Sequence, residues 1–443
     1  MLVFYLILSV VAIIVLTVRL KVHPFLALFL VAILYGIVAG MPLETIVTSV
    51  NDGFGNTLGK IGLIIVMGII IGAFLENSGG AYSIAERILK IIGSKRVLVA
   101  MGIIGYLVSI PVFADSGFLL LSPLNKSLSK KAKISLSGSA VALALGLTAT
   151  HTLVPPTPGP IAAAGILNAD LGIVMIIGLI ISALALVVGL VFASLYASRT
   201  FIDPNPEANE TDIQDRMSNA PGALKSTLPV VVPIVLIILK SVLHPLEGFL
   251  NHNIIGLLSF IGEPVVALFI GMLLSLTLPR KFEFEMLSTN GWVGKSLVGA
   301  ATIILITGAG GIFGQVLQNS GIAAVLSKSI GSIHLGLWLP FLLAAAIKTA
   351  QGSSTVSLIS TASIMVPLMG PLGFVSEIDK AIVVIAIGSG SMVVSHANDS
   401  FFWVVTQLSG MDVRTGYRVF STGTLILGFS AAVFSFIAFL IVA

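Results

Sequence analysis

Four prolines fall within six residues of a long apolar stretch, in the segment 155–160. A continuous α-helix cannot run through this segment, because each proline lacks a backbone N–H and its ring clashes with the carbonyl one turn earlier. At membrane depth, the peptide groups that such a break frees must be satisfied by protein, water or a ligand. The stretch 150–160 therefore predicts a broken helix whose break is enclosed by protein or lines a solute site.

The composition places this stretch in a membrane. Of 443 residues, 56% are hydrophobic and 9% are charged, whereas soluble proteins average about 25% charged residues. Residues 2–20 have no basic n-region before the apolar run, so a first span is expected rather than a cleaved signal peptide. The net charge of +4 is small and dispersed, which predicts no nucleic-acid partner, and the chain has no cysteine for disulfides or thiolate metal sites.

About ten segments are long and apolar enough to cross a bilayer as helices, each of which needs about 20 residues. Two of these segments, 134–166 and 381–409, are over-long and interrupted, so they are predicted to be discontinuous helices. The expected crossings are 2–20, 24–41, 59–76, 134–166, 171–198, 226–243, 254–277, 292–318, 381–409 and 419–443.

Two further apolar stretches, about 97–125 and 334–376, fit neither one crossing nor two. In the first, Asp115-Ser116-Gly117 is expected to break the helix, and only about eight residues then lead back to Lys126. This pattern is typical of a re-entrant hairpin. The segment 81–92 has charged and apolar residues at helical spacing and is expected to be an interfacial helix.

The basic residues give the orientation. With the N-terminus outside, all but five of the 23 Lys and Arg residues fall on the cytoplasmic side, as the positive-inside rule requires. Both termini are therefore predicted to be extracytoplasmic. The charged segment 199–225 is predicted to be a cytoplasmic linker between two halves.

The two halves repeat one another. Residues 72–79 match residues 314–321 at five of eight positions. Each half, 1–198 and 226–443, is expected to carry one hairpin and one broken helix in the same order, in opposite orientations. An all-α polytopic membrane protein with inverted repeats is the architecture of secondary transporters, whose solute site lies where the breaks meet.

The residues at the four predicted breaks suit one solute site. Small hydroxyl and amide side chains with glycines favour a polyhydroxylated or carboxylate-bearing solute, and the N-termini of half-helices favour an anion. The residues predicted to bind substrate are Ser116, Gly117, His151, Thr152, Thr157, Lys348, Gly352, Ser353, Ser354, Thr355, His396, Asn398 and Ser400.

Asp115, Asp399 and His151 are the candidates for proton coupling. Carboxylates inside a membrane are functional candidates by default, and imidazole titrates near neutral pH. Structural alternatives remain open for some of these residues. Asp115 could instead cap a helix, and His151 and His396 could each instead bond a carbonyl freed by a helix break. For Lys348 the alternatives are binding a substrate carboxylate and snorkelling to the outer surface.

Other chemistries find little support in the sequence. The glycine-rich segment 308–314 lacks a preceding strand, so close helix packing explains it better than a dinucleotide loop. Neither a P-loop nor metal-ligand spacing is present, so no cofactor or metal is expected and an ion gradient is the expected energy source. An intramembrane enzyme using His151, His396 and Asp399 is the alternative from another class, and a passive channel is a third.

Three motifs resemble the gluconate permease family of the ion-transporter superfamily. They are the run 113–118, the His-x-x-Val-Pro-Pro-x-Pro-Gly-Pro pattern at 151–160, and the segment 351–356. The resemblance implies proton-coupled import of a sugar acid such as gluconate, or in some members D-serine, across a bacterial inner membrane. It also implies a homodimer in the lipid bilayer, with a scaffold part and a moving transport part in each protomer.

Two positions depart from the commoner pattern of that family. Thr157 stands where a second histidine is frequent, and Lys348 stands where arginine is frequent. Arginine holds a carboxylate bidentately and lysine does not, so threonate or glycerate is an alternative cargo. Sodium coupling is the alternative to protons, because hydroxyls, amides and unwound carbonyls at helix breaks also bind sodium.

Overall fold

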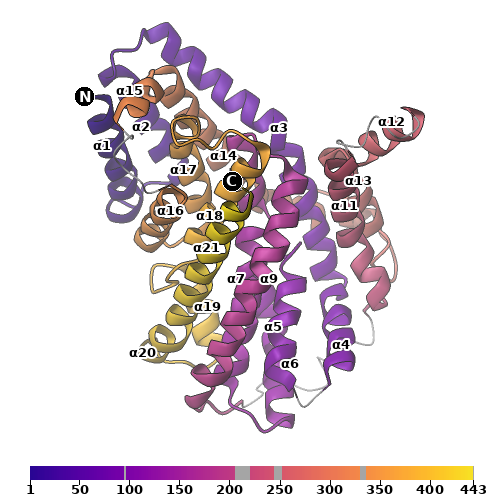
Figure 1. Cartoon of the computed structure of the whole chain (residues 1–443). Coiled ribbons are helices and arrows are strands. Elements are labelled where there is room, and N and C mark those ends of the chain that lie inside the picture. Colours follow the sequence, from indigo (N-terminus) through magenta and orange to yellow (C-terminus); the bar gives the residue numbers. More distant parts are fainter. Residues whose placement is uncertain (94–95, 205–219, 244–251, 330–335, 443) are drawn as a thin grey trace.

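The computed structural model describes residues 1–93, 96–204, 220–243, 252–329 and 336–442. The regular secondary structure of this part of the chain is entirely helical, with no strand, as the sequence predicts (Figure 1). The helices of the first half are α1 Leu2–Ile14 with the π-turn η1 Val15–Arg19, α2 Pro24–Val38, α3 Leu43–Asn77, α4 Gly80–Ile92, α5 Val97–Val108, α6 Ala114–Lys131, α7 Leu136–Leu153, α8 Pro158–Leu167, α9 Leu171–Leu195 and η3 Ala197–Arg199.

The second half has the same character. Of the predicted linker 199–225, residues 205–219 lie outside the described residues, as do 334–335 of the second predicted hairpin. The helices are α11 Ala223–Leu243, α12 His252–Ile261, α13 Pro264–Ser275, η5 Phe284–Leu287, α14 Trp292–Asn319, α15 Ile322–Ser329, α16 Trp338–Gln351, α17 Ser354–Met365, η7 Val366–Leu368, α18 Glu377–Ser391, α19 Ser400–Leu408, α20 Val413–Thr415, η8 Gly416–Ser421 and α21 Thr422–Val442.

Six of the described helices are long and apolar enough to span a membrane, and a seventh span results if α12 and α13 are taken together. These two helices meet at a 65° bend, so the expected crossing 254–277 is broken near Glu263. The expected crossing 59–76 is the second part of α3, a 35-residue helix that begins at Leu43. The full set of ten crossings stays a prediction.

Local sequence explains where several helices begin. Pro158 and Pro264 occupy the first turn of α8 and α13, where the missing N–H has no partner to lose. Asp170 caps α9 by accepting a hydrogen bond of 2.8 Å from the amide of Ile173. Ser376 and Asp379 form a reciprocal capping box at the start of α18.

The helices α3 and α14 form the central antiparallel pair. The ring of Phe74 near the end of α3 lies 5.2 Å from the ring of Trp292 at the start of α14. At the other end, a Cβ on Gly53 would fall 2.6 Å from the carbonyl oxygen of Gly311. The glycine-rich segment 308–314 therefore serves close helix packing, as the sequence predicts.

Four pairs of short helices surround breaks in the chain. One pair is α7 and α8, with a break at 154–157 inside the predicted stretch 150–160; in order along the chain this is the second break. The span 136–167 that contains it is 94% buried in its most apolar window. The other pairs are α5 with α6, α16 with α17, and α18 with α19, with breaks at 109–113, 352–353 and 392–399.

The first break differs from its predicted position. The chain turns at 109–113, whereas Asp115, Ser116 and Gly117 form the first turns of α6. Pro111 explains the difference, because it has no N–H with which to continue α5 and it disfavours helical geometry in the residue before it. The second arm is also longer than expected, since α6 continues to Lys131.

Candidate functional site

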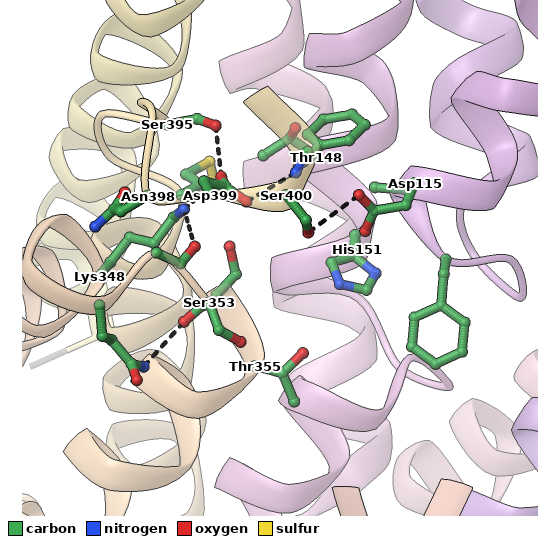
Figure 2. A pocket seen from close by; sticks show the side chains of 17 residues that line it. Asp115, Thr148, His151, Lys348, Ser353, Thr355, Ser395, Asn398, Asp399 and Ser400 are labelled. Atoms are coloured by element: carbon green, nitrogen blue, oxygen red, sulfur yellow. Dashed lines mark hydrogen bonds and ion pairs between the residues drawn. The ribbon is translucent and has the colours of Figure 1, made fainter. Parts of the chain in front are cut away.

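A cavity of about 300 Å³ lies between the first, third and fourth breaks and the end of α7 that leads into the second (Figure 2). We call it the central cavity. Its lining comes from α6, α7, α16, α17, α19 and the chain that joins them, so each half of the protein contributes. The lining residues are Phe113, Ala114, Asp115, Thr148, His151, Lys348, Gln351, Gly352, Ser353, Ser354, Thr355, Met392, Ser395, Asn398, Asp399, Ser400 and Phe401.

A buried ion pair joins two of the breaks. The Nζ of Lys348, in the last turn of α16, lies 2.6 Å from Oδ2 of Asp399, and their side chains are 1% and 10% exposed. Lys348 also donates a hydrogen bond to the carbonyl oxygen of Gly352. The snorkelling alternative for Lys348 is therefore wrong, because the ammonium is turned inward to a carboxylate.

Asp399 is held from several directions. Its Oδ1 accepts a hydrogen bond of 3.0 Å from the amide of Phe401, so it caps α19. Its Oδ2 accepts a second one of 2.5 Å from the hydroxyl of Ser395. The amide of Ser395 in turn donates to Oγ1 of Thr424 on α21 at 3.0 Å. These bonds fix the carboxylate in one orientation toward Lys348.

Asp115 faces this network from the opposite wall. The hydroxyl of Ser400, the residue after Asp399, donates to Oδ1 of Asp115 at 3.4 Å. Figure 2 shows Asp115 and Ser400 pointing toward one another across the cavity. Within the described ranges, Asp115 forms no ion pair. It is therefore a carboxylate at the cavity wall that no neighbouring cation neutralises directly.

His151 offers an unused polar atom beside Asp115. Its Nδ1 is buried and has no hydrogen-bond partner among the described residues. Its ring lies 5.8 Å from the ring of Phe113, measured between centroids. A buried imidazole nitrogen without a partner is energetically unfavourable, and this nitrogen is not itself exposed to the cavity, although other atoms of His151 line it.

The second hairpin packs closely on the fourth break. Gly352 has φ +92°, and a Cβ there would lie 2.2 Å from the carbonyl oxygen of Asn398. The side-chain amide of Asn398 donates hydrogen bonds to the carbonyl oxygens of Thr349 and Ala350 at 2.8 and 3.0 Å. These are the free carbonyls at the end of α16, which explains why an amide stands at this position.

Five of the residues predicted to bind substrate do not line the central cavity. Thr157 donates to the carbonyl oxygen of Val154 at 2.7 Å, and Thr152 donates to that of Thr148 at 2.9 Å. The others are Ser116, Gly117, which packs against Leu147, and His396, whose Nε2 lies 2.7 Å from the carbonyl oxygen of Thr349.

Several lining residues were not among those predicted to bind substrate. Thr148 lies one helical turn before His151, and Ser395 lies four residues before Asp399. This spacing to predicted site residues is the sequence feature by which both could have been predicted to line the cavity. Met392 and Phe401 are apolar residues in an apolar chain, and nothing in their local sequence distinguishes them. The structure thus adds two hydroxyl groups and the amide of Gln351 to the polar wall, and four apolar side chains, those of Phe113, Ala114, Met392 and Phe401, to the remainder.

The described part of the chain contains no group of three or more His, Asp or Glu side chains arranged to hold a metal ion. The chemistry of the central cavity is that of a binding site for a small polar solute. It offers hydroxyls, an imidazole ring, an unneutralised carboxylate and a lysine paired with an aspartate.

Comparison with known proteins identifies the family. Residues 1–441 match the family described as GntP family permease. The chain is a member of the GntP permease family. Members of this family are transport proteins, so the chain is a multi-pass membrane permease and not an enzyme.

Three relatives place this GntP permease among named transporters. It is 35% identical to the inner membrane permease YgbN of Escherichia coli K12, covering 95% of each chain. It is 35% identical to a gluconate permease of Pseudomonas aeruginosa, covering 96% of this chain and 95% of the relative. It is 33% identical to the D-serine transporter DsdX of Escherichia coli O6:H1, covering 95% and 94%.

The fold of this GntP permease also occurs in a solved structure. The YdaH transporter of Alcanivorax borkumensis, whose topology is described as unusual, superimposes with a TM-score of 0.66. The match covers 94% of this chain and 98% of the other at 14% sequence identity. At that identity the likeness concerns the fold alone.

Proposed function

We propose that this permease imports a sugar-acid anion, gluconate or a related aldonate, in symport with protons. The observation that carries the proposal is the central cavity, in which hydroxyl groups, Lys348 and an unpaired acid from opposite halves of the protein face one volume. The relatives named gluconate permeases support the same substrate class.

The polar wall matches the chemistry of an aldonate. Such a solute carries one carboxylate and a chain of hydroxyls, each of which donates and accepts hydrogen bonds. Ser353, Ser354 and Thr355 line the wall at the start of α17, where free backbone amides favour a carboxylate. The imidazole of His151 lines the same cavity and adds a polar ring to this wall.

Asp115 is the group we assign to proton coupling. A lone carboxylate beside an anion site repels the anion, and protonation removes that repulsion. Binding of the proton and of the anion therefore favour each other, which is the coupling that a symporter requires. Asp399 is a less suitable carrier because Lys348 neutralises it.

Uptake into inside-negative membrane vesicles tests the coupling ion. With an inwardly directed proton gradient, labelled gluconate is expected to accumulate whether or not sodium is present, and an uncoupler is expected to abolish the accumulation. Uptake that requires sodium and ignores the proton gradient would favour the sodium-coupled alternative instead. Flux without accumulation would indicate a passive channel.

D-serine is the second candidate substrate, because the central cavity presents both signs of charge. A zwitterion can direct its carboxylate to Lys348 and its ammonium to Asp399 or Asp115, all of which line the cavity. The relative named as a D-serine transporter makes the same suggestion. Inhibition of labelled gluconate uptake by unlabelled D-serine, threonate and glycerate ranks these solutes. If only D-serine inhibits, D-serine becomes the preferred substrate and the sugar acid the second candidate.

We further propose a homodimer in a bacterial inner membrane, with both termini on the extracytoplasmic side. The positive-inside bias of the sequence supports this orientation. Crosslinking in native membranes tests the dimer, since a chain that remains monomeric at all crosslinker concentrations contradicts it.

A further inference from the structure

A second polar cavity lies behind the tip that joins α5 and α6. It has a volume of about 360 Å³, is lined by α3, α14 and the tip residues, and is open to solvent at Asn77 and Lys295. We call it the Lys295 cavity. Phe113 lines both this cavity and the central cavity, so the two volumes share a wall. The polar residues around the Lys295 cavity are Glu76, Asn77, Lys295 and Ser296.

The two charged residues of this cavity have no ionic partner in the described part of the chain. Glu76 projects from the last turn of α3 and Lys295 from the first turn of α14, and neither forms an ion pair with a described residue. Lys295 is exposed to solvent at the edge of this concave site, and an ammonium without a counter-ion there attracts carboxylates. The cavity thus has an anion-binding side and a carboxylate side.

The Lys295 cavity has a counterpart at the other end of the α3–α14 pair. That smaller cavity, about 110 Å³, is lined by α3 residues 53–60 and α14 residues 311–318. Glu76 and Gln318 take equivalent places in the sequence repeat 72–79 and 314–321. A lysine, Lys60, also lines this smaller cavity. Because α3 and α14 are antiparallel, the two cavities lie at opposite ends of the pair, as an entrance and an exit would.

We propose that the Lys295 cavity is a second binding site for the transported anion, separate from the central cavity. Lys295 binds the carboxylate, while the oxygens of Glu76 and Asn77 accept hydrogen bonds from solute hydroxyls. The anion occupies this site between the central cavity and the side of the membrane that the sequence predicts to be cytoplasmic. The inference rests on the proposed function, because it assumes that a sugar acid passes through.

Trp292 provides a direct reporter, since it lines the Lys295 cavity. The chain has three tryptophans, so the substitutions Trp338→Phe and Trp403→Phe leave Trp292 as the only one. In the purified full-length protein with this background, gluconate is expected to change Trp292 fluorescence saturably. Equilibrium dialysis with labelled gluconate is expected to find two molecules bound per chain.

The substitution Lys295→Gln separates the two sites. It is expected to weaken the Trp292 response about tenfold or more, as loss of a charge-assisted bond does, and to leave one gluconate bound per chain. The matched control is Lys281→Gln, which removes an exposed lysine outside the cavity lining and is expected to keep both sites. One gluconate per chain in the wild type, or an unchanged Trp292 response in Lys295→Gln, would overturn the second site.

Uptake by the wild-type chain distinguishes this failure from failure of the proposed function. If vesicles accumulate gluconate but the protein binds one molecule per chain, the second site is wrong and the proposed function stands. If vesicles accumulate no aldonate, both proposals fall together.

Discussion

The three charged side chains of the central cavity have different roles. Lys348 and Asp399 form an ion pair and neutralise one another. Burying a charge costs desolvation free energy, and in a buried ion pair the attraction between the two charges offsets that cost only while both are present. Asp115 stands apart, since its carboxylate has no ion pair within the described residues and accepts only a long hydrogen bond of 3.4 Å from a serine side chain. We therefore propose that the pair balances charge at the binding site and that Asp115 carries the coupled proton.

Removing one member of the pair is expected to destabilise the protein more than removing both. Lys348→Gln or Asp399→Asn leaves a buried charge without its partner, and losses of about 3–5 kcal/mol are typical for such changes. The double variant removes both charges and should recover part of this loss. Thermal unfolding of the purified variants in detergent measures the coupling. Additive losses in the double variant would show that the two side chains do not interact.

Asp115→Asn is expected to abolish concentrative uptake while the protein still inserts, because the amide cannot carry a proton but has nearly the same shape. Labelled gluconate uptake, normalised to the amount of protein in the membrane, measures this effect. The control is Asp412→Asn, which changes the exposed cap of α20 to another good capping residue and should transport normally. Concentrative uptake by Asp115→Asn would remove Asp115 from the coupling mechanism.

At the scale of elements, the breaks of the first half rest directly on the backbone of α3. A Cβ on Gly72 would lie 2.2 Å from the carbonyl oxygen of Pro111, and one on Gly68 would lie 2.8 Å from that of Pro156. These two glycines are four residues apart and therefore share a face of the helix. The tip of the first hairpin and the proline-rich break thus both require a helix surface without side chains.

Gly72→Ala is expected to impair transport and to lower stability by about 1–3 kcal/mol, because the added methyl group forces the hairpin tip away from α3. The matched control is Gly59→Ala in the same helix, where no atom lies within 4 Å of the added Cβ and alanine favours the helix. Uptake and thermal unfolding of both variants test the contact. Equal behaviour of the two variants would contradict it.

At the scale of the whole molecule, Figure 1 shows α1, α2 and α15 at one end of the protein and α4, α6 and α20 at the other. The antiparallel pair of α3 and α14 connects the two ends, with a polar cavity near each. An inverted repeat predicts this relation between equivalent helices. If the two halves are inverted repeats, as the sequence predicts, the two ends are expected on opposite sides of the membrane.

The absence of native cysteine makes this orientation testable. Val375→Cys is expected to react with a membrane-impermeant maleimide applied to intact cells, because its loop is predicted to be extracytoplasmic. Thr289→Cys is expected to react only after the membrane is opened, because its loop is predicted to be cytoplasmic. Both positions are exposed in the structure. The reverse labelling pattern would invert the topology.

The sequence by itself determined the helical membrane fold, the family and three of the four breaks, because proline, glycine and apolar length act locally on the chain. It misplaced the first break, since the carboxylate of Asp115 is a more conspicuous feature than Pro111, which ends α5. The tertiary structure decided which predicted residues meet. It paired Lys348 with Asp399, 51 residues away, and placed Thr157 outside the cavity lining. Such pairings depend on how helices from both halves pack, which no local pattern records.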